Sequence, residues 1–329
     1  MKKIFYPIIS AAAAVALFST AAQAQTASFL DVNPDPVAMS VAGTGTVMEA
    51  TPFAMWNNIA ATALDDRTLQ VGAAYSLWQP SYTSNHVAAV AGYGRVAKFM
   101  TVSASVKYFS HKPYDVTDGV TGAVTGSFTP MDLQAGIGLG FKILPILSLG
   151  ANVNYVHSDI GGPKKGGAVS ADFGALLDLK FLRVGVTAAN IGSRLDYGGT
   201  TAYSLPANVK LGVGTIQRFG PEDRHAVAVN LEGGMTFEQS AFFAGVGAQY
   251  VFNDFVRVGL GYHYGDKDKL IAGSYASFGA GIKFLGISVN AAYILGFKQA
   301  SDISSPVESL YDFSAPMSNT FSVGIVYEF

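Results

Sequence analysis

The five histidines are the first candidates for chemistry, because imidazole binds metal ions readily and titrates near neutral pH. Four of them fall at the ends of hydrophobic segments, where they could form a metal-binding or pH-sensing rim: His86, His111, His157 and His263. These four lie on separate segments, however, and no two are close in sequence. We therefore interpret them as polar anchors at segment ends, and the sequence predicts neither a metal site nor a cofactor.

Ten charged side chains are the second set of candidates, because each interrupts an apolar or small-residue segment. Alternate residues of an extended strand point to opposite faces, so these charges would share the face turned away from the apolar residues. There they would either neutralise one another as a structural network or line a polar route for a solute. Their mixed signs favour the network. The ten are Lys107, Lys142, Asp172, Asp178, Arg183, Lys210, Glu232, Arg257, Lys283 and Glu328.

Catalytic motifs are missing from the sequence, which contains no nucleophile elbow, zinc-binding helix or phosphate-binding loop. The pair Gly43 and Gly45 precedes no strand and helix unit of the kind that binds dinucleotides. A lipid hydrolase assembled from scattered serines, histidines and aspartates stays an alternative. Otherwise the sequence predicts a protein that is not an enzyme.

The composition indicates a surface that water does not cover entirely. Half of the 329 residues are hydrophobic and 13% are charged, against about 25% charged in typical soluble domains. Residues 1–24 are typical of a signal peptide that is cleaved near Ala24. Without Lys2 and Lys3 the chain carries 19 basic and 23 acidic residues, a net charge of −4, so we expect no nucleic-acid partner. The absence of cysteine excludes disulfides and thiolate metal sites.

Beyond the signal peptide no window approaches the roughly 18 unbroken apolar residues of a membrane helix. The alternative way to satisfy every backbone group in lipid is a closed β-barrel. The segment LSLGANVNY, residues 147–155, alternates apolar and small or polar residues as a barrel strand does. Residues 133–142 and 256–264 follow the same pattern. The sequence therefore predicts an all-β fold located in the outer membrane of a Gram-negative cell, in contact with lipid and lipopolysaccharide.

The alternating pattern recurs often enough to predict a 14-stranded antiparallel transmembrane barrel over residues 68–329. Short and long connections alternate along the chain, as expected when one end of the barrel has tight turns and the other has loops. The terminal Phe329 is typical of the last strand of a bacterial outer-membrane barrel. The predicted strands are 68–78, 86–96, 100–110, 131–143, 147–157, 167–179, 182–191, 207–217, 225–234, 240–252, 255–264, 274–284, 287–296 and 318–329.

Residues 25–67 precede the first strand, and we expect them to form a hatch that fills the barrel. Thr51 as N-cap and Pro52 at the first helical position predict one short helix over residues 52–61. Inward glycines such as Gly138 and Gly247 have two interpretations: either another backbone presses against the wall there, or small residues are simply tolerated. The residues that we assign to the hatch geometry are Pro34, Asp35, Gly43, Gly45, Pro52, Trp56 and Asn57.

Two stretches carry a resemblance to a known family. The stretch FLDVNPDPVAMSVAGTGTVMEATPFAMWNNIAATAL, and ANIGSRLDYGG followed by SLPANVKLGVG, are similar to sequences of the PorV/PorQ family, relatives of the FadL-type barrels. The family tends to have Asn-Pro after the tryptophan, whereas this chain has Asn57-Asn58. The resemblance implies a 14-stranded outer-membrane barrel with an amino-terminal hatch. For PorV it further implies a role in type IX secretion, with translocon, cargo or surface-attachment proteins as partners.

Two functions follow as expectations. The first is a non-enzymatic, secretion-associated component that binds proteins through its long loops, residues 111–130 and 297–317. The second loop carries three apolar residues that either contact a partner or cap the barrel: Leu310, Tyr311 and Phe313. The alternative is a FadL-like passive transporter of small hydrophobic molecules, which requires an apolar pocket near the hatch and a route past it.

Overall fold

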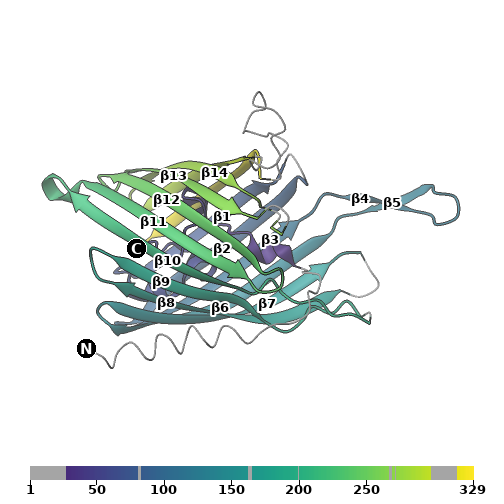
Figure 1. Ribbon diagram of the computed structural model, residues 1–329, viewed down its shortest axis with the longest axis horizontal. Coiled ribbons are helices and arrows are strands. Elements are labelled where there is room, and N and C mark those ends of the chain that lie inside the picture. The colour runs from purple at the N-terminus through teal and green to yellow at the C-terminus, as the bar shows by residue number, and fades with distance from the viewer. Residues whose placement is uncertain are drawn as a thin grey trace.

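The computed structural model describes residues 27–80, 83–161, 165–198, 200–266, 269–270, 272–297 and 317–329. The signal-peptide prediction and the three apolar residues Leu310, Tyr311 and Phe313 lie outside the described residues. The described part forms a closed antiparallel barrel of fourteen strands (Figure 1). The predicted fold class is confirmed.

Every predicted strand is present, and each boundary lies within two residues of the predicted one. The barrel strands are β1 (Leu69–Trp78), β2 (Asn85–Ala97), β3 (Met100–Ser110), β6 (Met131–Leu144), β7 (Leu147–Asp159), β8 (Gly166–Asp178), β9 (Arg183–Gly192), β10 (Asn208–Phe219), β11 (His225–Thr236), β12 (Ala241–Phe252), β13 (Val256–Gly265), β14 (Tyr275–Phe284), β15 (Ile287–Gly296) and β16 (Thr320–Glu328). Each strand pairs with its neighbours in sequence, and the barrel closes where β1 pairs with β16. We call the end with short connections the turn end and the other the loop end.

The outward faces of the strands form an apolar band. On β7, for example, Leu149, Val153 and Tyr155 are exposed, while the alternating Ser148, Asn152 and Asn154 are buried in the lumen. Apolar side chains that face outward over a whole barrel match a lipid environment. No helix in the described part of the chain is long and apolar enough to cross a membrane.

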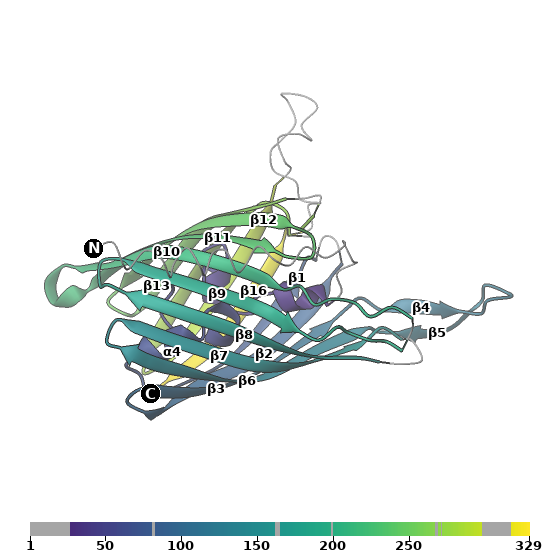
Figure 2. The same cartoon turned by 60° about the horizontal axis from the view of Figure 1, so that its bottom comes forward.

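A two-stranded hairpin projects from the loop end, formed by β4 (Tyr114–Thr117) and β5 (Val124–Phe128) (Figures 1 and 2). We expected residues 111–130 to be a loop without strands. The backbone pairs instead, because Asp118 accepts hydrogen bonds from Val120 N and Thr121 N and so closes a tight turn. The hairpin thus forms a narrow extension beyond the barrel wall.

Residues 27–67, which we call the hatch, run through the lumen from the loop end to the turn end (Figure 2). The hatch contains η2 (Ser28–Asp31) and three short helices, α2 (Pro36–Ser40), α3 (Ala54–Asn57) and α4 (Ala60–Leu64). The prediction of one helix over residues 52–61 was wrong. Asn58 takes an extended conformation with φ −153° and ends α3, because its side chain bonds the backbone of three different segments.

The inward glycines mark where the hatch lies against the wall. A Cβ atom added to Gly247 would lie 2.5 Å from Val41 O, and one added to Gly150 would lie 2.6 Å from a methyl of Ile59. Gly185 and Gly212 face Thr46 in the same way. The structure therefore supports the first of the two interpretations of these glycines, close approach of another segment. The set, which we call the glycine track, includes Gly138, Gly140, Gly174, Gly245, Gly259, Gly261 and Gly279.

Candidate functional site

The loop end of the lumen is filled by an apolar cluster that the hatch and the wall build together. The hatch contributes Phe29, Leu30 and Val32, while Leu195 and Leu205 cover them from the connection between β9 and β10. All are buried. The wall members of this outer apolar cluster are Val87, Phe109, Val156 and Ala168.

A buried lysine lies directly beneath this cluster. Lys107 Nζ donates to Leu30 O at 3.2 Å and to Val32 O at 2.9 Å, and it faces the rings of Phe29 and Trp56. Carbonyl oxygens and ring faces both favour a cation, so this one side chain holds the segment around Leu30 and Val32 against β3. Lys107 thus fixes the start of the hatch.

The wall contains an irregularity next to Lys107, where β8 and β9 lose register between Ala171 and Phe173. Asn190 adopts a positive φ of 59° in this bulge, and its N–H donates to Asp172 Oδ1 at 2.6 Å. The other Asp172 oxygen accepts from Asn152 and Asn154. The carboxylate therefore replaces the strand hydrogen bonds that the bulge interrupts.

Asp35 is the centre of the hatch and is fully buried. It caps α2 by accepting from Val37 N at 2.9 Å, and it also accepts from Thr51 Oγ1 and Asn57 Nδ2. Asn57 in turn accepts from Asn33 at 2.6 Å. Burial raises the pKa of the Asp35 carboxyl, and its hydrogen bonds and the charge of Arg257 offset part of that rise. The departure from Asn-Pro, in which Asn58 replaces the proline, thus supplies a second hydrogen-bonding amide beside Asn57.

Three further hatch residues that we assigned from sequence, Trp56, Gly45 and Gly43, pack at separate places in the lumen. Trp56 stacks on Phe53, and its indole N–H donates to Gln134 Oε1 at 2.9 Å, so it packs between hatch and wall. Gly45 has no room for a side chain because Asn57 lies against it. Gly43 has a φ of +74°, which only glycine adopts readily.

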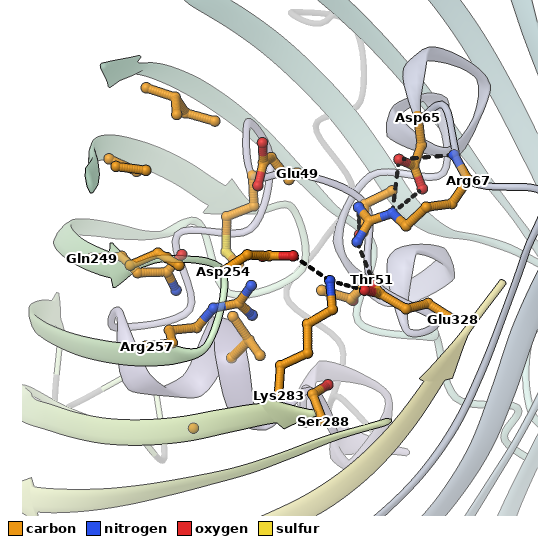
Figure 3. Close-up of a pocket in the computed structure, with 18 of the residues that line it drawn as sticks. Glu49, Thr51, Asp65, Arg67, Gln249, Asp254, Arg257, Lys283, Ser288 and Glu328 are labelled. Atoms are coloured by element: carbon orange, nitrogen blue, oxygen red, sulfur yellow. Dashed lines mark hydrogen bonds and ion pairs between the residues drawn. The ribbon is translucent and has the colours of Figure 1, made fainter. Parts of the chain in front are cut away.

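A cavity of about 990 Å³ opens below the hatch at the turn end (Figure 3). Its walls include apolar hatch residues such as Val37 and Val41, and many charged residues from the barrel. Most of the charges form ion pairs: Arg67 with Asp65 and Glu328, Arg183 with Asp178, Arg218 with Glu49, Arg224 with Glu222, and Lys283 with Asp254 and Glu328. The cavity is therefore polar at its mouth and partly apolar at its roof.

The ten predicted lumen charges separate into three groups rather than one network. Lys107 and Asp172 lie near the loop end, and Lys210 lies 4.0 Å from Glu232 at mid-height. Glu232 also accepts from Thr46 N of the hatch at 2.9 Å. The third group lines the turn-end cavity, with Asp178, Arg183, Arg257, Lys283 and Glu328. Lys142 is half-buried and joins none of these groups.

The sequence analysis missed Asp65, Arg67 and Tyr93, which link the end of the hatch to the wall. Tyr93 donates to Asp65, and Arg67 lies between Asp65 and Glu328. The available signal was the run Asp65-Asp66-Arg67, since the rest of the hatch carries only three other acids, Asp31, Asp35 and Glu49. The interpretation of His263 as a polar anchor was wrong, because its ring is stacked between Phe243 and Tyr275 inside the lumen.

Metal binding finds no support among the described residues, where no group of three or more histidine, aspartate or glutamate side chains could hold an ion. The arrangement is instead that of a filled barrel with an apolar end, a polar middle and a charged cavity.

Solved structures similar to this chain are barrels of the FadL type. The toluene transporter TbuX of Ralstonia pickettii is 13% identical, with 89% of this chain and 97% of that chain covered and a TM-score of 0.58. The toluene transporter TodX of Pseudomonas putida is 12% identical, with 89% and 97% covered and a TM-score of 0.62. A FadL homologue of Pseudomonas aeruginosa is 14% identical, with 90% and 98% covered and a TM-score of 0.56.

No protein-family model and no curated protein matches the chain. At 12 to 14% identity the likeness to these structures establishes the fold. The chain thus shares the barrel architecture of these outer-membrane proteins.

Proposed function

We propose that this protein is a passive, non-enzymatic channel of the outer membrane for small hydrophobic molecules. The observation that carries the proposal is the outer apolar cluster, in which Phe29 and Leu30 of the hatch occupy a pocket that the wall and a loop line with apolar residues. A small hydrophobic molecule would find the same contacts if this end of the hatch moved aside. Burying it there would be favourable by about 25 cal/mol for each Å² of apolar area.

The structural neighbours support this proposal over the secretion-associated one. One of them is described as a toluene transporter, and two others are described as monoaromatic hydrocarbon channels. The partly apolar roof of the turn-end cavity offers a continuation of the route below the hatch. Aromatic hydrocarbons are the first ligands to test.

The test is uptake of radiolabelled toluene by cells that lack their own FadL-type barrels and express this chain. We expect uptake to rise well above that of cells expressing an unrelated barrel of similar size. A rate equal to that control, with the protein folded in the membrane, would refute the proposal.

A second candidate function is the partner-binding role that the PorV/PorQ resemblance implies. The observation that favours it is the β4–β5 hairpin, which projects beyond the barrel (Figure 1). Val120, between its two strands, is 94% exposed. Exposed apolar side chains on an isolated hairpin suit a protein contact. Removal of residues 114–128 should abolish recovery of secretion or cargo proteins with the tagged barrel, while toluene uptake persists.

A further inference from the structure

Arg257 differs from the other arginines that line the turn-end cavity. Arg67, Arg183, Arg218 and Arg224 each have a carboxylate within 3.2 Å. Arg257 is partly buried on β13, yet it forms neither an ion pair nor a hydrogen bond with any described residue. A half-buried guanidinium in a cavity wall that has no partner among the described residues is available to a ligand in that cavity.

Gln249 on the adjacent strand provides a second unused donor. Its Nε2 atom is buried and has no hydrogen-bond partner among the described residues. In the ladder, Val251 is opposite Arg257 and Gln249 is opposite Gly259, so both side chains point inward as diagonal neighbours. Diagonal neighbours in a sheet lie about 7 to 8 Å apart, within reach of long side chains. Figure 3 shows both of them directed into the cavity.

The free donors of these two side chains favour a negatively charged ligand. Val37 and Val41 of the hatch and Val251 of the wall line the same cavity, and low polarity strengthens an interaction with a guanidinium. A guanidinium has a planar fork of donors that matches two oxygens of a carboxylate or phosphate group. The amide N–H of Gln249, beside that fork, can donate a further hydrogen bond to the same group. The guanidinium of Arg257 and the free amide N–H of Gln249 thus both offer donors to such a group.

We propose that Arg257 and Gln249 form a binding site for one oxyanion, a carboxylate or phosphate group, beneath the hatch. The anion enters through the turn-end cavity either as a free small ion or as the head group of an amphipathic molecule. A hydrocarbon such as toluene has no such group, so this site goes beyond the proposed transport function and does not depend on it.

The experiment is isothermal titration of the full chain, folded in a non-ionic detergent, with four probes. Acetate and inorganic phosphate represent free ions, octanoate represents an amphipathic head group, and octanol is the uncharged match of octanoate. We expect saturable binding of at least one anion and none of octanol at the same concentration. Binding of the free ions alone identifies a small-anion site, and much tighter binding of octanoate identifies a head-group site.

Two variants and a matched control complete the test. Arg257→Gln should weaken anion binding at least roughly tenfold, because a charge-assisted pair of hydrogen bonds is lost. Arg257→Lys keeps the positive charge but loses the planar fork of donors. Its affinity for the anion should lie between those of the unaltered chain and Arg257→Gln. Arg218→Gln, in the same cavity but paired with Glu49, should bind as the unaltered chain does. Absence of saturable anion binding, equal binding of octanol and octanoate, or undiminished binding by both Arg257 variants would overturn the proposal.

Discussion

Arg67 Nη1 lies 2.8 Å from Oε2 of Glu328, so the residue that ends the hatch is paired with the next-to-last residue of the chain. The same guanidinium lies 2.9 Å from Asp65, and Glu328 also contacts Lys283. The end of the hatch, β14 and the last strand β16 therefore meet at one ion-pair network. Because β1 and β16 form the seam that closes the barrel, this network fixes the hatch at the seam.

Replacing Arg67 by methionine should lower the free energy of unfolding by about 2 kcal/mol. The substitution keeps the length of the side chain, but it leaves Asp65, whose side chain is 10% exposed, without its cation. Urea unfolding of the barrel in lipid vesicles measures the change. As a control, Arg218→Met breaks a pair in which both side chains are about half exposed, and should cost less than about 1 kcal/mol. Equal effects of the two substitutions would show that the seam network contributes no more than a surface pair.

The glycine track predicts a contrast between two glycines on adjacent strands. A Cβ at Gly247 would lie 2.5 Å from Val41 O of the hatch, whereas one at Gly233 meets nothing closer than 3.8 Å. Gly247→Val should therefore destabilise the protein by about 2 kcal/mol through overpacking, and Gly233→Val should be neutral or slightly stabilising. The free energy of unfolding tests both.

Protease cleavage adds a direct readout of the hatch in the same pair of variants. Arg67 is the sole lysine or arginine between residue 25 and the first strand, so trypsin can sever the hatch from the barrel only there. We expect faster cleavage after Arg67 in Gly247→Val than in Gly233→Val. The same cleavage rate in both would mean that the wall yields and the hatch stays in place.

The sequence predicts the strands of this barrel better than its hatch, for a physical reason. In a membrane barrel, strand residues that face lipid are apolar and alternate with small or polar residues that face the lumen. The residue types of Leu149 and Asn152 therefore predict which side of the wall each one faces. Hatch residues obey no such period, since they pack on all sides. Asn58 ends a helix through bonds to Thr46 and Ala175, residues that are distant in sequence. The pairing of Arg67 with Glu328, 261 positions apart, likewise depends on barrel closure.

The buried Asp35 predicts a pH dependence of stability. Its pKa is raised in the folded protein from the ordinary value of 3.8, mainly by burial. The folded state then holds the proton more tightly than the unfolded state. The stabilisation from Asp35 is complete below pH 3.8 and is lost as pH rises through the raised pKa. The difference in unfolding free energy between the native chain and Asp35→Asn should therefore decrease with rising pH in that window.

Asp118 serves as the control of opposite sign. Hydrogen bonds from Thr121 and Val120 lower the pKa of this exposed carboxyl in the hairpin turn. Its contribution is present above the ordinary pKa and is lost as pH falls through the lowered one, so Asp118→Asn should show the reverse trend. A pH-independent difference for Asp35→Asn would contradict the assignment of a raised pKa.

An engineered disulfide between hatch and wall tests whether transport requires the hatch to move. A Cβ at Gly245 would lie 3.0 Å from Cγ2 of Thr44, and a cysteine sulfur at the Cγ2 position can therefore bond to a second cysteine at residue 245. The chain has no cysteine of its own, so Thr44→Cys with Gly245→Cys forms one defined pair. Because the hatch fills the middle of the lumen against the glycine track, passage along the barrel axis requires it to shift. Toluene uptake by the double variant should fall several-fold when the disulfide is oxidised and recover when it is reduced. Uptake by Thr44→Cys alone should change under neither oxidation nor reduction. Unchanged uptake with the disulfide fully formed would place the route through the wall, beside a stationary hatch.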